Sequence, residues 1–284
     1  MHLGHGAIFF AALIGCQEGI TLPQQGSPEP VSFVNEGATL SGEIALPPGR
    51  GPFPGVVLVH GSGPVSRENN APLRSVFLEQ GFAVLSYDKR GIGASGGAYR
   101  GVGPLNSDSM IRLLAGDAAA GLRAMAAHPR LDSRRLGLAG GSQAGWIIPN
   151  AATRFPVAFS VILSGPLVTV GQEIWFSNAF EQSARPLADA DAVLAAFSGP
   201  PGYDPVPDIR RMSGQVYWVL GGKDRSIPAE RSATLARSLI DELPRPTWRV
   251  ALLPEGDHAL RHAGNGQMLA YWPEVFAWLR RYMR

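Results

Sequence analysis

Continuous apolar runs that recur along the chain are the feature that most constrains how these 284 residues can fold. Residues 55–60 read Gly-Val-Val-Leu-Val-His, and residues 82–87 form a second such run. A strand with apolar side chains on both sides must be covered on both faces, as the strands of parallel sheets are. Between Asp108 and Ala127, apolar residues instead recur at helical spacing. The alternation of the two patterns predicts a mostly parallel sheet with helices on both faces.

The remaining elements follow from the same patterns. Residues 31–34 and 39–46 alternate apolar and polar positions around Asn35-Glu36-Gly37, which predicts an antiparallel pair leading the sheet. Further buried strands are expected at 136–139, 157–163, 215–220 and 248–253, and further helices at 72–80, 228–240 and 271–283.

Composition excludes several classes of protein. Hydrophobic residues make up 45% of the chain and charged residues 17%, which fits a globular protein and neither a disordered nor a multi-span membrane protein. The net charge is only +2, and Lys89 and Lys223 are the only lysines. Nucleic-acid binding needs a concentrated basic stripe, and the sequence has none. We therefore expect a small-molecule substrate and no nucleic-acid partner.

The single cysteine, Cys16, excludes an internal disulfide and a zinc site built from several cysteines. It follows a short apolar run, and Leu13-Ile14-Gly15-Cys16 resembles the lipobox of bacterial lipoproteins. We predict a signal peptide over residues 1–16, with Cys16 lipidated and anchoring the exported protein to the bacterial envelope, and a linker over 17–30. The alternative is a frayed N-terminal extension on a cytoplasmic enzyme.

Residues 165–212 break the regular alternation of strands and helices. The segment is rich in Pro and Gly, with a helix expected near 188–197. We interpret it as a small cap inside a single domain spanning 31–284, the alternative being a disordered surface insertion. Four aromatic residues are candidates for an apolar substrate pocket, although such residues serve packing as often as recognition. They are Trp146, Trp175, Phe176 and Phe180.

Ser142 stands where an apolar strand runs through small residues directly into a helix. A serine hydroxyl attacks a carbonyl only if its oxygen stands clear of the surface on a sharp, strained turn. The backbone around such a turn passes close to its neighbours, which Gly140, Ala144 and Gly145 permit. Ser142 is therefore the predicted nucleophile. The alternative is an incidental serine in a glycine-rich turn, since Ala144 occupies the second glycine position of the Gly-x-Ser-x-Gly pattern.

A serine nucleophile needs a base, and the only histidines after Ser142 are His258 and His262. His258 lies nearer the end of the predicted strand 248–253 and is the preferred base, with His262 the alternative. Asp224 follows the strand 215–220 and is expected to orient the imidazole, although it could also be an exposed turn residue. The resulting order of serine, aspartate and histidine is that of α/β-hydrolases.

An oxyanion requires backbone donors, one of them from the residue after the nucleophile, here Gln143. The compact loop at residues 60–64 follows an early strand, and we expect its Ser62 amide to be the second donor, with Gly61 the alternative. His60 is interpreted as a structural histidine, because a base there would crowd the oxyanion.

Five segments together resemble, in order and rough spacing, bacterial α/β-hydrolases of the serine aminopeptidase-like and dienelactone hydrolase-like groups. They are His60-Gly61-Ser62-Gly63-Pro64, Tyr87-Asp88-Lys89-Arg90-Gly91-Ile92-Gly93-Ala94-Ser95, Gly140-Gly141-Ser142-Gln143-Ala144-Gly145-Trp146, Gly222-Lys223-Asp224 and Asp257-His258. The resemblance implies an eight-stranded core, no metal or organic cofactor, and hydrolysis of an ester, thioester or amide. It also implies that residues 88–95 form a structural turn without a catalytic role.

The same resemblance separates this chain from other members of the superfamily. Haloalkane dehalogenases and epoxide hydrolases have an aspartate where this chain has Ser142, and dienelactone hydrolases proper use a cysteine. Prolyl oligopeptidases carry a large N-terminal propeller, for which this chain has no room. The prediction is a serine carboxylesterase for small or medium acyl groups. The alternatives are a thioesterase, acyltransferase or aminopeptidase-like amidase with the same triad, and a catalytically silent envelope lipoprotein. The sequence leaves the oligomeric state open.

Overall fold

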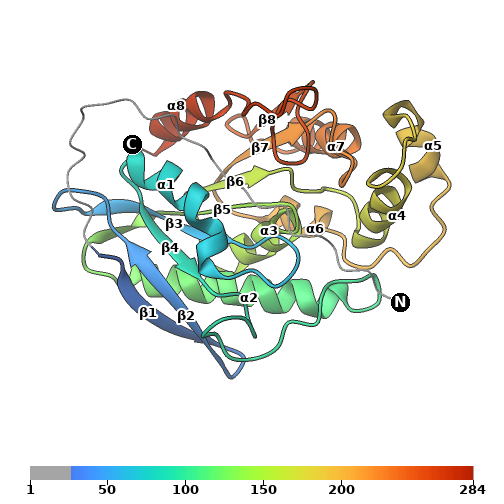
Figure 1. Ribbon diagram of the computed structural model, residues 1–284. Coiled ribbons are helices and arrows are strands. Elements are labelled where there is room, and N and C mark those ends of the chain that lie inside the picture. Colours follow the sequence, from blue (N-terminus) through green and yellow to red (C-terminus); the bar gives the residue numbers. More distant parts are fainter. Residues whose placement is uncertain (1–26, 284) are drawn as a thin grey trace.

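The computed structural model describes residues 27–283, which form one eight-stranded sheet flanked by helices (Figure 1). The strand order is β1-β2-β4-β3-β5-β6-β7-β8. Only β2 runs antiparallel to its neighbours, and the other pairs are parallel. The strands are β1 (Glu29–Asn35), β2 (Ala38–Ala45), β3 (Phe53–Val59), β4 (Ala83–Tyr87), β5 (Leu131–Gly141), β6 (Phe159–Leu163), β7 (Gln215–Gly221) and β8 (Arg249–Leu253). The predicted α/β-hydrolase architecture is confirmed.

Helices cover both faces of the sheet, as the apolar runs require. On one face, α2, α3 and α7 enclose the larger core cluster, and on the other α1 and α8 enclose the second. Figure 1 shows α2 and α8 on opposite sides of the sheet. The helices are α1 (Ala71–Glu79), preceded by the 3-10 turn η1 (Arg67–Asn70), α2 (Ser107–Ala126), α3 (Ala144–Arg154), α7 (Ala229–Glu242) and α8 (Trp272–Tyr282).

The sequence of α2 explains its place against the sheet. Ile111, Leu114, Ala118 and Leu122 follow one another at helical spacing and are all buried. A single alanine-rich face lets the helix backbone approach the strands closely. Central strands such as β4 are buried at every position, which is why they read as continuous apolar runs rather than alternating ones.

The insertion between β6 and β7, residues 165–212, contains α4 (Val170–Phe180), the 3-10 turn η2 (Leu187–Asp189), α5 (Ala190–Ala195) and α6 (Val206–Arg211). The helix expected near 188–197 corresponds to η2 and α5. The longer helix α4 was not predicted, because its apolar residues lie on several sides and give no helical period. Phe176, Phe180 and Val193 form a small core of their own between α4 and α5.

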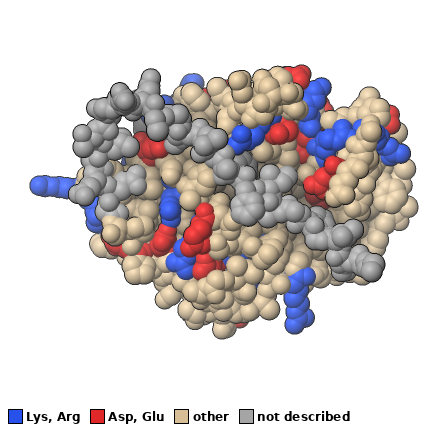
Figure 2. All heavy atoms as spheres, in the orientation of Figure 1, with Lys and Arg blue, Asp and Glu red and all other residues tan. Residues whose placement is uncertain are grey.

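The predicted signal peptide and Cys16 lie outside the described residues, as does most of the predicted linker. No helix within residues 27–283 is long and apolar enough to cross a membrane. On the face shown in Figure 2, acidic and basic side chains of the described part are interspersed, and no basic stripe is visible there.

Candidate active site

Ser142 occupies the turn that joins β5 to α3, with a backbone φ of 56°. A positive φ strains any residue other than glycine, and such strain is concentrated at functional sites. The turn is held by the Ser142 N–H, which donates to the carbonyl of Leu163 at 3.0 Å. A Cβ on Gly140 would lie 2.3 Å from the carbonyl oxygen of Val59, and one on Gly145 would lie 2.6 Å from Gly165 Cα. Only glycine fits at these two positions, which the sequence pattern anticipated.

Ala144 shows why the second glycine of the pattern is dispensable here. It is the first residue of α3, and it is completely buried in the larger core cluster. Its methyl group therefore packs rather than clashes. The close contact with the next strand falls one residue later, at Gly145, whose added Cβ would meet the backbone of Gly165.

Asp224 and His258 meet at the carboxyl ends of β7 and β8. His258 Nδ1 lies 2.8 Å from Asp224 Oδ2. The other carboxylate oxygen of Asp224 accepts hydrogen bonds from the backbone N–H groups of Ser226, at 2.8 Å, and Ile227, at 3.0 Å. The Asp224 side chain is fully buried. Because its orientation is fixed by backbone donors, this carboxylate holds the imidazole in one orientation and leaves Nε2 for another partner.

The charges around His258 favour its protonated form. Burial alone would lower the pKa of His258, but the Asp224 charge and hydrogen bond outweigh it and raise the pKa above its ordinary value. The charge of Glu181 adds to this effect. The imidazole is therefore prepared to accept a proton.

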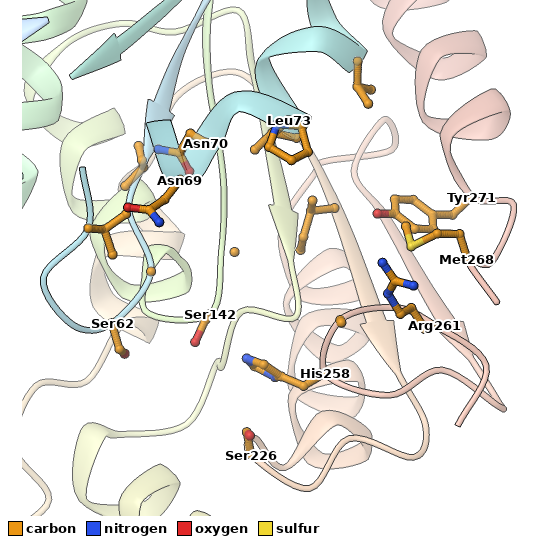
Figure 3. Close-up of a pocket in the computed structure, with 18 of the residues that line it drawn as sticks. Ser62, Asn69, Asn70, Leu73, Ser142, Ser226, His258, Arg261, Met268 and Tyr271 are labelled. Atoms are coloured by element: carbon orange, nitrogen blue, oxygen red, sulfur yellow. The ribbon is translucent and has the colours of Figure 1, made fainter. Parts of the chain in front are cut away.

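A cavity of about 280 Å³ brings these groups together. Ser142 and His258 both line it, and Figure 3 shows the His258 ring directed toward Ser142. Asn69, Asn70 and Leu73 of η1 and α1 form one side. Arg261, Met268 and Tyr271, which follow β8, form another.

The loop after β3 lies directly against Ser142. A Cβ on Gly61 would lie 3.7 Å from Ser142 Cβ, and both Gly61 and Ser62 line the cavity. Within residues 27–283, the backbone N–H groups of Gly61, Ser62 and Gln143 donate no hydrogen bond. These amides can therefore receive an anionic oxygen from a ligand. The arrangement leaves Ser62 and Gly61 both available as the second donor.

His60, at the start of this loop, is buried and takes no part in the cavity lining. Its Nε2 lies 2.6 Å from the carbonyl oxygen of Tyr87, and burial lowers the pKa of His60 to about 3. A neutral imidazole that donates to the end of β4 anchors the loop and does not act as a base.

The insertion contributes a polar side to the cavity through Glu173, Ser177 and Glu181. Ser177 Oγ donates to one oxygen of Glu181 at 2.8 Å, and Ser226 Oγ donates to the other at 3.0 Å. Burial raises the pKa of Glu173 to about 8; the charge of His258 opposes this shift, and the charges of Asp224 and Glu181 add to it. Glu173 is therefore mainly protonated at neutral pH.

The expectation that four aromatic residues line the substrate pocket is corrected by the structure, because none of them lines this cavity. Trp146 is buried in the core, where its Nε1 donates to the carbonyl of Val168 at 2.9 Å. Trp175 is 41% exposed and donates to Val193. Phe176 and Phe180 pack together inside the insertion. Trp175 also packs against the ring of Phe197, so the apolar surface of all four side chains serves packing.

Several cavity residues gave no signal in the sequence. Glu173 and Glu181 lie in and just after α4, a helix that was not predicted, and Arg261 follows the predicted base. His262, the alternative base, lies outside the cavity lining, and its Nδ1 accepts from the backbone N–H of Gly264 at 3.0 Å. No group of three or more potential metal ligands occurs within residues 27–283.

Comparison with known proteins gives the class. The fold is similar to that of the Pyrococcus furiosus esterase Pf2001, at 20% identity, complete coverage of both chains and a TM-score of 0.67. It is also similar to a Klebsiella pneumoniae protein assigned as a dienelactone hydrolase, at 18% identity, 90% coverage of this chain, 98% of that chain and a TM-score of 0.61. Esterase EstD of Thermotoga maritima is 40% identical over 72 residues, which cover 22% of this chain and 18% of EstD.

The fold and the family relationship define a serine hydrolase with an α/β-hydrolase fold. The model of the prolyl oligopeptidase family matches residues 70–284, and the chain belongs to this family. This finding corrects the expectation that separated the chain from prolyl oligopeptidases. The match begins just before α1 and includes Ser142, Asp224 and His258.

Proposed function

We propose that the protein is a carboxylesterase that cleaves small to medium acyl esters through a covalent acyl-enzyme. The observation that carries this proposal is the convergence of Ser142, on its strained turn, with the His258–Asp224 pair at one cavity. The similarity of part of the chain to Esterase EstD, and of its fold to esterase Pf2001, points to the same reaction.

In the proposed reaction, His258 takes the proton of the Ser142 hydroxyl as the serine oxygen attacks the ester carbonyl. The amides of Gln143 and Ser62 stabilise the oxyanion, and Asp224 stabilises the imidazolium. His258 then gives its proton to the departing alcohol. Water, deprotonated by the same histidine, attacks the acyl-enzyme and releases the acid. No step requires a group from outside the protein other than water.

The size and lining of the cavity support an acyl group of modest length. A volume of about 280 Å³ accommodates a short to medium chain. Leu73 and Val76 of α1 line the cavity together with Leu163 at the end of β6. An aliphatic acyl chain would bury its surface against these side chains.

The test is the hydrolysis of p-nitrophenyl esters of increasing acyl length by the wild type and by Ser142→Ala. We expect hydrolysis of the acetate and butyrate esters, with a loss of about 10⁴-fold or more in kcat for Ser142→Ala. Retention of wild-type turnover in Ser142→Ala would refute the assignment of the nucleophile. Absence of turnover on every ester would refute the reaction.

A second candidate, hydrolysis of aminoacyl amides, is favoured by Glu173 and Glu181 in the cavity wall. An ammonium group beside these carboxyls would favour the ionised form of Glu173 and would gain an ion pair. The same carboxyls disfavour the phosphates of an acyl-CoA, the substrate that a thioesterase or acyltransferase would need. Comparing turnover on an aryl ester, an acyl-CoA and an aminoacyl p-nitroanilide separates the three reactions.

For the location in the cell, we propose export and lipidation at Cys16, which rests on the sequence Leu13-Ile14-Gly15-Cys16 alone. Incorporation of labelled palmitate in a bacterial host, lost in Cys16→Ser, would support this proposal. A soluble cytoplasmic product without label would contradict it.

A further inference from the structure

Lys89 is a buried lysine beside the active site for which the proposed reaction has no role. It follows β4, is completely buried, and forms no ion pair within the described part of the chain. A lysine is almost never buried without strong compensating interactions. The partners of its ammonium group therefore indicate what the residue does.

Two of those partners are carbonyl groups of the loop after β3. Lys89 Nζ donates to the carbonyl oxygen of Gly61 at 2.7 Å and to that of Gly63 at 3.0 Å. The Gly61 carbonyl belongs to the same peptide group as the N–H of Ser62, the proposed oxyanion donor. In a trans peptide the C=O and N–H bonds point in opposite directions. Binding the carbonyl from one side therefore fixes the direction of the N–H on the other side.

The third partner connects Lys89 to the other oxyanion donor. Lys89 Nζ donates to Gln143 Oε1 at 3.1 Å, and Gln143 Nε2 lies 3.4 Å from the hydroxyl of Tyr99. The ammonium also lies 3.8 Å from the centre of the Tyr99 ring. One buried cation is thus bound to both segments that carry the proposed oxyanion donors.

We propose that Lys89 is a positioning residue for the oxyanion hole, which orients and polarises the Ser62 amide through the Gly61 carbonyl and holds Gln143 beside it. A positive charge at the carbonyl oxygen withdraws electron density from the peptide and makes its N–H a stronger donor. The residue does not touch the substrate. The inference rests on the proposed function, because it assigns Lys89 to the oxyanion of that reaction.

The charge state of Lys89 gives the inference a pH signature. Burial lowers the pKa of Lys89 to about 7. Next to it, the carboxylate of Asp88 is bound by Arg67, and His60 is neutral because burial lowers its pKa to about 3. Glu173 in the cavity, where burial raises its pKa to about 8, is the other group that changes charge in this range. Tyr99 and Gln143 are the polar side chains in contact. As pH rises through 7, Lys89 loses its proton and the polarisation of the Ser62 amide weakens.

The experiment compares Lys89→Met and Lys89→Gln with wild type. We expect Lys89→Met to lower kcat by about 10- to 100-fold with little change in KM. Lys89→Gln keeps a side-chain donor, and its kcat should lie between those of Lys89→Met and wild type. The affinity for a trifluoromethyl ketone, which forms a tetrahedral adduct, should fall by the same factor as kcat/KM. The affinity for the carboxylic acid product should not change. Lys223→Met, which removes the exposed second lysine, is the matched control.

A measurement on the wild type keeps the inference testable if neither variant folds. The chain contains only two lysines, so NMR of ¹³C-labelled lysine resolves the titration of Lys89. We expect that titration to coincide with an alkaline fall in kcat. Values of kcat/KM within twofold of wild type in Lys89→Met, equal losses for the ketone and the product acid, or a Lys89 titration without a fall in kcat would each overturn the inference. Absence of ester or amide hydrolysis in the wild type would instead refute the proposed function.

Discussion

Two walls of the cavity are built in different ways. The strand-end wall consists of Ser142, His258 and the loop after β3, with Asp224 and the loop after β4 behind them. It is fixed by backbone hydrogen bonds at the carboxyl ends of the strands. The insertion wall, defined by Glu173, Ser177 and Glu181, is connected to the rest of the molecule mainly by side chains. Arg225 Nη2 donates to the carbonyls of Ser183 and Arg185, both at 2.8 Å.

This difference separates the groups proposed to carry out the reaction from those that would select the substrate. A triad and an oxyanion hole need positions fixed to a fraction of an ångström, which strand ends supply. A wall connected by side-chain contacts can change in sequence without disturbing those positions. We therefore expect substitutions in the strand-end wall to change kcat or stability strongly, and substitutions in the insertion wall to change substrate preference and pH dependence more mildly.

The largest effect is expected for Asp224→Asn in the strand-end wall. The amide cannot stabilise the imidazolium and favours the wrong tautomer of His258, so kcat should fall about 10³- to 10⁴-fold while KM changes little. The pKa of His258 should also fall, because Asp224 raises it. The acid limb of the kcat/KM profile therefore moves to lower pH.

Asp257→Asn is the matched control for this prediction. Asp257 adjoins His258 in sequence, but its carboxylate accepts a hydrogen bond from the backbone N–H of Arg261 at 2.8 Å and does not bind the imidazole. Steady-state kinetics should place Asp257→Asn within a few-fold of wild type. Equal losses of kcat in the two variants would mean that the loss in Asp224→Asn does not come from its contact with His258.

The next effect concerns the stability of the strand-end wall, at Arg67 and Asp88. Arg67 Nη2 lies 2.8 Å from Asp88 Oδ2, and although burial opposes it, the interactions with Arg67 lower the pKa of Asp88 to about 2. A lowered carboxyl pKa stabilises the fold above the unfolded-state value near 4, and that contribution is lost as pH falls through 2. Arg67→Met should therefore lower the free energy of unfolding by about 1–2 kcal/mol at neutral pH.

Urea unfolding between pH 2 and 7 measures this contribution. The difference between Arg67→Met and wild type should shrink as pH falls from 4 toward 2. Arg134→Met, which removes an 88% exposed arginine side chain from its pair with Asp132, should change stability by less than about 0.5 kcal/mol. A pH-independent difference for Arg67→Met would assign its effect to packing instead.

The smallest effect is expected for Glu173→Gln in the insertion wall. Since Glu173 is mainly protonated below pH 8, a neutral amide should leave kcat for a neutral ester within a few-fold of wild type. The acid limb should stay where it is, because a protonated Glu173 carries no charge that could raise the pKa of His258. A rise in KM confined to cationic aminoacyl substrates would favour the amidase candidate, and a large loss of kcat on neutral esters would contradict the division between the walls.

The contrast between the walls also explains how far the sequence could be interpreted. The central strands were predictable because burial on both faces forces continuous apolar runs, and the positions of Ser142 and Asp224 followed from the ends of β5 and β7. His258 follows β8, a strand at the edge of the sheet that is only partly buried, so the expectation of a buried strand at 248–253 was wrong although a strand is present. The roles of these three residues stay predictions. The need for a small residue at position 145 was also predictable, because the backbone beside a sharp turn passes close to its neighbours. The neighbour proves to be the backbone of Gly165.

The insertion wall was not predictable by the same means. An aromatic residue in an insertion can cover a cavity or pack in a small core, and only the tertiary contacts distinguish the two. Phe176 and Phe180 pack on each other, whereas Glu173 of the same helix faces the cavity. Lys89 was missed for a related reason, because its three hydrogen-bond acceptors come from two loops distant in sequence.

The assignment of Ser142 as the nucleophile is tested by covalent labelling with a fluorophosphonate, followed by mass spectrometry of the labelled peptide. A probe of this kind reacts with a serine that an adjacent base activates. Three serines besides Ser142 line the cavity, so the position of the label distinguishes Ser142 from other serines within reach of the probe. They are Ser62, Ser177 and Ser226. The account predicts label on Ser142 alone, abolished in Ser142→Ala and strongly slowed in Asp224→Asn. Label on another serine, or none on folded protein, would contradict it.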